Sequence, residues 1–297
     1  MALIEKENET QGLQEQQKTT TAVVPILHIN NIYKSFNYNS SSGNANDPET
    51  RKKNSRLIST HDVLSGLELK INEGEFVTIV GASGCGKSTL LNIIAGLDRL
   101  DAGSVFVKGS DNISSTKRIM IFQEGALFPW LSVQENVEFG LKIANISKQQ
   151  RRHIADKYIE LVGLSRFSES FVYQLSGGMK QRVAIARALA LEPEILLMDE
   201  PFAALDVQTK DLLHEELVGI HKTTRKTILF VTHNINEAIL LGDRVIVLSA
   251  SLKNIKKEFV IDLPRPRDPE IPELYEVKRQ ILNEFEGDLQ LARIGGQ

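Results

Sequence analysis

A glycine-rich run between an apolar strand and a helix constrains the fold of this chain more than any other feature. The run is Gly81-Ala82-Ser83-Gly84-Cys85-Gly86-Lys87-Ser88, followed by Thr89, and it matches the pattern G-x-x-x-x-G-K-[ST] in full. The apolar run 76–80 precedes it, and helical periodicity is predicted over 89–97. Glycines 81, 84 and 86 are expected to take positive φ angles, which turn successive N–H groups inward to cradle phosphates.

The side chains of this run predict binding of ATP and Mg²⁺. Lys87 is expected to reach the β- and γ-phosphates, and the Ser88 hydroxyl to bind the metal. The nucleotide-binding candidates are Gly81, Ala82, Ser83, Gly84, Cys85, Gly86, Lys87, Ser88 and Thr89. Cys85 is the single cysteine of the chain, so no intrachain disulfide can form, which fits a reducing cytosol. It is not expected to act as a nucleophile, since phosphoryl transfer to water needs none.

Two adjacent carboxylates, Asp199 and Glu200, follow the apolar run 195–198. In α/β proteins the carboxyl ends of strands are where ligands bind. Because neighbouring residues of a strand point to opposite faces, the two acids can have different duties. Asp199 is expected to bind the metal ion, and Glu200 to polarise an attacking water as a general base.

The order of apolar runs and helical patterns predicts an α/β fold. Short apolar runs at 119–122, 195–198, 228–231 and 244–248 alternate with helical patterns at 149–162, 179–191, 212–222 and 236–241. Such alternation is typical of a parallel sheet covered on both faces. Two strands are expected earlier, an edge strand over 25–32 and a half-buried strand over 63–71, separated by a loop insertion at about 37–61. Residues of about 124–191 are mostly helical and predict an inserted helical subdomain.

Composition excludes several classes of protein. The 35 basic and 38 acidic residues give a formal net charge of −3, which argues against a nucleic-acid partner. No stretch approaches the ~20 apolar residues of a membrane span, so a soluble chain is expected. Residues 1–24 are predicted to form a disordered tail, and 267–297 a tail with one amphipathic helix.

A serine followed by two glycines begins a third informative segment. The string Leu175-Ser176-Gly177-Gly178-Met179-Lys180-Gln181-Arg182 opens a clear helical pattern. Helix N-termini with this composition bind anions. The chain therefore offers two surfaces suited to phosphate, and the residues alone leave open whether they meet within one molecule.

The string L-S-G-G-M-K-Q-R resembles the signature of the ATP-binding cassette (ABC) ATPases, and the family's other elements occur in the family's order. Gln123 resembles the Q-loop glutamine, which senses Mg²⁺ and the transmembrane partner, and Asp206 resembles the D-loop aspartate. His233 resembles the switch histidine that contacts the γ-phosphate. The resemblance covers about 25–266 and implies a P-loop core with a mostly parallel sheet, an antiparallel β subdomain and an inserted helical subdomain.

The resemblance also implies a dimer. In this family two ATPase subunits pair head to tail, either two copies or a chain and a paralogue. Ser176, Gly177 and Gly178 would then contact the ATP bound to the partner. An aromatic ring stacks on adenine after the family's first strand, which selects Phe36, with Tyr33 and Tyr38 as alternatives.

Two segments resemble one branch of the family, the importers of nitrate, sulfonates and taurine. One is 126–137, which contains Pro129 and Trp130, and the other is 261–267. One departure is Ala203, where this branch usually has glycine. The resemblance implies integral membrane permease subunits as partners, a substrate-binding protein as an indirect one, and a peripheral place at the cytoplasmic face of the cell membrane.

Two other interpretations are weaker. A soluble ABC-type ATPase acting on nucleic acid or ribosomes commonly fuses two cassettes or inserts long coiled coils, and this chain does neither. A P-loop kinase would need an acceptor site and would leave the signature and His233 unexplained.

Overall fold

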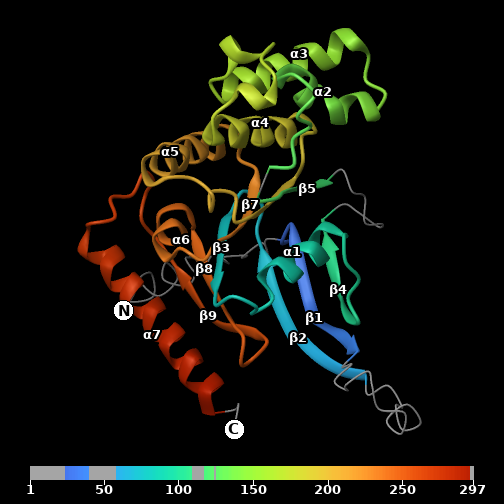
Figure 1. The fold of residues 1–297 in the computed structure, drawn as a ribbon. Helices are drawn as coiled ribbons and strands as arrows, with labels where there is room; N and C mark the ends of the chain where they lie inside the picture. Colours follow the sequence, from blue (N-terminus) through green and yellow to red (C-terminus); the bar gives the residue numbers. More distant parts are fainter. Residues whose placement is uncertain (1–23, 40–57, 109–116, 124, 295–297) are drawn as a thin grey trace, which may run out of the picture.

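A six-stranded, mostly parallel sheet forms the centre of the molecule (Figure 1). In this computed structural model the described residues are 24–39, 58–108, 117–123 and 125–294. The strand order is β5 (Arg118–Ile121), β6 (Ile195–Asp199), β7 (Thr227–Val231), β3 (Phe76–Gly81), β8 (Arg244–Ser249) and β9 (Asn254–Val260). The first five are parallel and β9 pairs antiparallel with β8. The predicted α/β class is therefore confirmed.

The strands β6, β7, β3 and β8 are buried on both faces, because they are apolar at nearly every position. Along β6, Leu196 and Met198 pack into a cluster with α4 (Gly177–Ala190) and α5 (Val207–Thr224). Ile195 and Leu197 face the opposite cluster, which contains α1 (Lys87–Ala95). Strand alternation thus divides one short run between two cores.

A second, antiparallel sheet packs beside α1, as Figure 1 shows. Its order is β2 (Ile58–Ile71), β1 (Leu27–Asn39) and β4 (Ala102–Val107). The expected edge strand over 25–32 is therefore wrong: β1 is the central strand, because β4, which sequence patterning does not reveal, pairs along its other side. The pairing of β1 with β2 also reaches into both ends of the expected 37–61 insertion, and 40–57 lie outside the described residues.

The helical subdomain projects at one end of the molecule (Figure 1). It contains α2 (Val133–Ile143), α3 (Lys148–Leu161) and the short turns η3 (Ser165–Phe167) and η4 (Val172–Gln174), and α4 runs beneath them back to the sheet. A capping box begins α2: Ser132 accepts the Glu135 N–H, and Glu135 accepts the Ser132 N–H. Val137 of α2, Ile159 of α3 and Val183 of α4 share one buried cluster.

Four of the five predicted helical patterns lie within two residues of the observed helices α1, α3, α4 and α6, and the fifth differs by a turn or more. Helix α5 begins at Val207, five positions before the expected 212, because Asp206 caps it by accepting the Thr209 N–H at 3.0 Å. Helix α6 (Ile235–Leu241) lies as expected. Helix α7 (Pro272–Ile294) packs back on the domain through Leu274 and Ile281, both fully buried. The predicted tail over 1–24 falls almost entirely outside the described residues.

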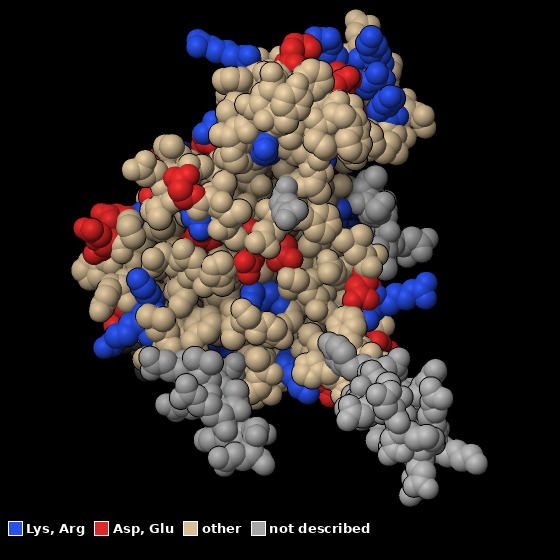
Figure 2. All heavy atoms as spheres, viewed as in Figure 1, with Lys and Arg blue, Asp and Glu red and all other residues tan. Residues whose placement is uncertain are grey.

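The surface carries charges of both signs. On the face drawn in Figure 2, acidic and basic side chains are interspersed, with several basic ones on the helical subdomain. Within the part of the chain that the structure describes, no helix has the length and hydropathy needed to cross a bilayer.

Candidate nucleotide-binding and hydrolysis site

The glycine-rich run forms a tight loop between β3 and α1, and its glycines serve two different purposes. Gly84 and Gly86 have φ of +80° and +99°, as predicted. Gly81 does not take positive φ, which corrects the sequence prediction. A Cβ at Gly81 would lie 2.5 Å from the Cys85 sulfur and 2.6 Å from the Leu248 carbonyl oxygen. Glycine is needed there for close packing, while at 84 and 86 it is needed for the turn.

Lys87 is held under this loop. Its side chain is buried, and Nζ donates to the carbonyl oxygens of Gly81 at 2.8 Å and Ala82 at 3.1 Å. The third acceptor of Nζ is the Cys85 sulfur, which accepts hydrogen bonds only weakly, so Lys87 can turn this donor toward an anion in the loop. Cys85 is only 1% exposed, and its sulfur lies 3.9 Å from Lys87 Nζ.

A cavity of about 450 Å³ opens over the loop. Besides Lys87 and Glu200, five predicted residues of the loop line it: Ser83, Gly84, Gly86, Ser88 and Thr89. Phe36 also lines the cavity, whereas Tyr33 is not among the lining residues and instead lies against Gly66. The geometry therefore favours Phe36 among the aromatic candidates, and the Tyr38 side chain lies outside the described residues.

Ser88, which lines the cavity, contacts Asp199 at the end of β6. The Ser88 hydroxyl donates to Asp199 Oδ1 at 3.2 Å. Burial raises the pKa of Asp199, with the neighbouring Glu200 adding to the effect and Ser88 and Lys87 opposing it. A half-buried carboxylate of this kind gains from a nearby cation. One carboxylate and one hydroxyl suit Mg²⁺, which usually completes its shell with phosphates and water.

Glu200 and His233 form a pair at the ends of adjacent strands. Nδ1 of His233 lies 2.9 Å from Oε2 of Glu200. Glu200 follows β6 and takes a φ of +46°, uncommon for a residue with a side chain, and His233 follows β7. A carboxylate held by an imidazole beside a phosphate-binding loop can accept a proton from a bound water.

Other predicted residues lie apart from this cavity. Ser176 caps α4 by accepting the Met179 N–H at 3.3 Å. Gly177 and Gly178 leave no room for a side chain against Leu205 and Thr209 of the segment that begins α5. Asp206 caps that helix, and Gln123 is exposed just beyond β5. None of these five residues is among those that line the cavity over the loop.

Sequence reasoning missed two residues of the cavity wall, His61 and Val63. His61 is the cross-strand partner of Phe36 in the β1–β2 ladder. Only the register could have revealed this, because the residues between the two strands carry no pattern that fixes which positions face each other.

The known proteins that this chain resembles are ATP-binding proteins of transporters. A family model described as "ABC transporter" matches residues 64–203. The nitrate import ATP-binding protein NrtD of Synechocystis sp. is 48% identical over 218 residues, which cover 73% of this chain and 82% of that protein. The aliphatic sulfonates import ATP-binding protein SsuB of Bacillus cereus is 42% identical over 242 residues, 80% of this chain and 94% of that protein. The bicarbonate transport ATP-binding protein CmpD of Synechococcus elongatus is 42% identical over 231 residues, 75% and 83% of the two chains.

Solved structures share the fold. The dimeric, post-hydrolysis structure of the ATP-binding cassette MJ0796 with ADP and Pi superposes with a TM-score of 0.65 at 32% identity, covering 80% of this chain and all of that one. The structure of cbiO1 from Clostridium perfringens, part of the ABC transporter complex cbiONQ, gives a TM-score of 0.67 at 26% identity, covering 92% and 98%.

Proposed function

This chain belongs to the ATP-binding proteins of the ABC transporters, and on that premise we propose that it drives import of a small anion of the nitrate, sulfonate or taurine type. Its activity is ATP hydrolysis coupled to transport. The observation that carries the proposal is the grouping of Lys87, the Ser88–Asp199 contact and Glu200 around one cavity. The anion class rests on relatives named for nitrate, bicarbonate and aliphatic sulfonate transport.

In the proposed hydrolysis, Glu200 accepts a proton from the attacking water, whose oxygen bonds to the γ-phosphorus as the bond to ADP breaks. His233 holds the Glu200 carboxylate through Nδ1, and its proposed role is to contact the γ-phosphate. Lys87 and the inward N–H groups of the loop stabilise the charge that spreads over the phosphate oxygens. Ser88, Asp199 and Gln123 are the proposed ligands of Mg²⁺, which neutralises charge on the β- and γ-phosphates when bound. Phe36 provides the ring on which adenine stacks.

Dimer formation completes the site in this proposal. ABC cassettes form dimers, as the MJ0796 structures do. Ser176, Gly177, Gly178 and Asp206 lie apart from the cavity of their own chain, so we place them against the ATP of a head-to-tail partner, a second copy or a paralogous subunit. The N-terminus of α4 suits this role because it directs free N–H groups and a positive dipole end at an anion.

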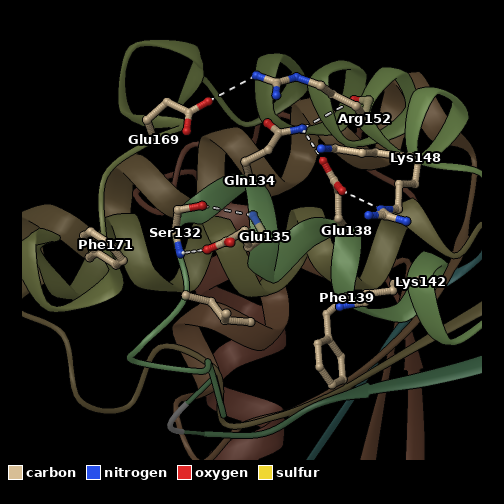
Figure 3. A pocket seen from close by; sticks show the side chains of 12 residues that line it. Ser132, Gln134, Glu135, Glu138, Phe139, Lys142, Lys148, Arg152, Glu169 and Phe171 are labelled. Atoms are coloured by element: carbon tan, nitrogen blue, oxygen red, sulfur yellow. Dashed lines mark hydrogen bonds and ion pairs between the residues drawn. The ribbon is translucent and has the colours of Figure 1, made fainter.

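We propose that the helical subdomain carries the surface that meets a membrane permease. A hollow of about 480 Å³ lies between α2, α3 and the segment before the signature (Figure 3). Gln134 and Glu138 lie one turn apart on α2, with Gln134 Nε2 3.2 Å from Glu138 Oε1, and the Arg152 side chain of α3 reaches Glu169 at 3.1 Å (Figure 3). Trp130, next to this hollow in the chain, is 69% exposed. An exposed aromatic beside a polar hollow suits a short helix from a partner.

Two measurements test this function. Tagged chain should co-purify with an integral membrane protein from detergent-solubilised cells. A deletion strain should lose growth on nitrate as the sole nitrogen source, or on taurine or alkanesulfonates as the sole sulfur source, and regain it with the wild-type gene. Normal growth on all of these nutrients, with recovery of the chain on nucleic acid or ribosomes, would contradict the proposal.

A further inference from the structure

A buried carboxylate contacts Thr232, the residue that precedes His233. Glu237, on α6, is 5% exposed, and its Oε2 accepts a hydrogen bond from the Thr232 hydroxyl at 2.6 Å. Its Oε1 lies 3.7 Å from His214 Nε2 and 4.0 Å from Lys210 Nζ, both on α5. Burial acts to raise the pKa of Glu237, but the neighbouring His214 and Thr232 outweigh it and hold the pKa below its usual range. Glu237 therefore remains a carboxylate inside the protein.

Glu237 fixes the turn that carries His233. The Thr232 hydroxyl donates to Glu237 and also accepts the backbone N–H of Asn234 at 3.0 Å. Thr232 N–H in turn donates to the Ile79 carbonyl oxygen of β3 at 3.1 Å. Thr232 and Asn234, which flank His233, are thus joined through the Thr232 hydroxyl, and the Glu237 carboxylate orients that hydroxyl.

His214 contacts the segment of Glu200 as well. Its ring meets the ring of Phe202 edge to face, with centroids 5.4 Å apart. Phe202 is fully buried, and its N-terminal neighbour is Pro201, which follows Glu200 directly. One buried imidazole on α5 therefore packs against the segment that carries Glu200 and faces the carboxylate that holds the His233 turn.

We propose that His214 is a positioning residue for ATP hydrolysis, which holds Glu200 through Phe202 and His233 through Glu237 and Thr232. This inference rests on the proposed roles of Glu200 and His233. It also connects those roles to α5, the helix that Asp206 caps. Movement of α5 when a partner subunit meets Asp206 would be transmitted to both members of the pair.

The buried polar atoms of His214 and Glu237 favour a contact whose length changes during function over a contact with a fixed structural role. Among the described residues, both ring nitrogens of His214 and Glu237 Oε1 are buried without a hydrogen-bond partner. Unsatisfied buried polar atoms are rare and costly in folded proteins. A shift of about 1 Å would turn the 3.7 Å separation into a charge-assisted hydrogen bond. The contact thus has a second, shorter arrangement within reach.

Two substitutions test the inference in the full chain with Mg-ATP. H214F keeps a ring against Phe202 but removes the nitrogen that faces Glu237, and E237Q keeps the shape of the side chain but removes its charge. Both should lower kcat by ~10-fold, the scale expected for slight misplacement of reacting groups. KM for ATP should stay within about twofold, because neither residue lines the cavity over the loop. The double variant should be no slower than the slower single variant, since both changes break one link.

His221 provides a matched control. It lies two turns further along α5, is 5% exposed, and meets Phe76 edge to face at 5.4 Å. Its Nε2 pairs with the Gly74 carbonyl oxygen at 3.0 Å, away from the Glu200–His233 pair. H221F should therefore lower thermal stability and leave kcat unchanged.

Three results would overturn the inference: wild-type kcat in folded H214F and E237Q, additive losses in the double variant, or losses that appear in KM instead of kcat. If H214F fails to fold, E237Q carries the test alone. The E200Q variant separates this inference from the proposed function. If E200Q is inactive while E237Q turns over normally, only the role of His214 fails; if E200Q turns over normally, the role of Glu200 itself fails.

Discussion

Nδ1 of His233 lies 2.9 Å from Oε2 of Glu200, although 33 positions separate the two residues in the chain. They meet because β6 and β7 are parallel neighbours, so the residues that follow each strand emerge at the same edge of the sheet. Glu200 takes a φ of +46°, a conformation that costs energy and is most often found where function requires it. The parallel pairing of β6 with β7 therefore brings Glu200 and His233 together, and the local backbone conformation of Glu200 holds the pair.

Removal of the Asp199 carboxylate should weaken binding of metal-loaded nucleotide. In D199N, affinity for Mg-ATP should fall by at least an order of magnitude, the loss typical of damaged metal sites. Affinity for ATP in EDTA should stay within about twofold, because the loop N–H groups and Lys87 are unchanged. Titration calorimetry with and without Mg²⁺ measures both. D156N, on the exposed surface of α3, is the control, and equal losses with and without metal would contradict the assignment.

Two glycines of the loop should differ in their tolerance of alanine. Gly84 has open space where a Cβ would be built, so G84A adds only the strain of a positive φ, about 1–2 kcal/mol. At Gly86 the Cβ would also lie 2.9 Å from Val63 Cγ1, so G86A adds overpacking of about 1–3 kcal/mol. Urea denaturation should rank G86A as the less stable of the two. A reversed ranking would contradict this account of the loop.

Arg267 should be a major contributor to stability. Its guanidinium, 9% exposed, donates to carbonyl oxygens at the end of α6 and beyond, including Ile239 at 2.8 Å and Ile261 at 3.1 Å. Burial lowers the pKa of Arg267 to about 10, and the adjacent Arg265 adds to that effect. R267A should lower the free energy of unfolding by about 2–4 kcal/mol, because it leaves buried carbonyls unpaired. R279A, whose side chain is 63% exposed and pairs with Glu276, should change it by less than about 0.5 kcal/mol.

Tyr158 should make the protein sensitive to alkaline pH. Its hydroxyl donates to Glu192 at 3.3 Å, and burial together with the Glu192 charge raises the pKa of Tyr158 from 10.0 to about 12. Between these values the unfolded chain releases the phenolic proton before the folded one, so the free energy of unfolding falls as pH rises. Y158F lacks this group and should show a shallower decline from pH 10 to pH 12 in denaturant titrations. Equal slopes in the two proteins would contradict the interpretation.

Much of the fold could be predicted because β3, β6 and β7 are continuous apolar runs, the pattern of a strand buried on both faces. Strands β4 and β9 were missed for the opposite reason. In β4 all residues but Val105 and Val107 are exposed, so no apolar alternation marks this strand. Strand β9 lies at the edge of its sheet and contains Lys256, Lys257 and Glu258 in sequence. Tertiary pairing, which no local pattern records, forms both strands.

Some residues of the candidate site, like some strands of the fold, could be predicted from the sequence, and others could not. Lys87, Ser88, Asp199 and Glu200 could be predicted because each belongs to a motif that is contiguous in sequence. The place of His61 in the cavity wall and the proposed role of His214 toward Glu200 and His233 could not be predicted from the sequence. Each depends on register or helix packing between segments far apart in the chain, His61 through β1 and His214 through Glu237.

The most direct test of the whole account is the rate of ATP hydrolysis by E200Q. This change keeps the shape of the Glu200 side chain and removes its ability to accept a proton. The account predicts that turnover falls by ~10²–10⁴ while Mg-ATP still binds, and that the ATP-bound chain elutes as a dimer in size-exclusion chromatography. Turnover within twofold of wild type, in a variant that folds and binds Mg-ATP normally, would contradict the claim that Glu200 is the base of an ABC ATPase site.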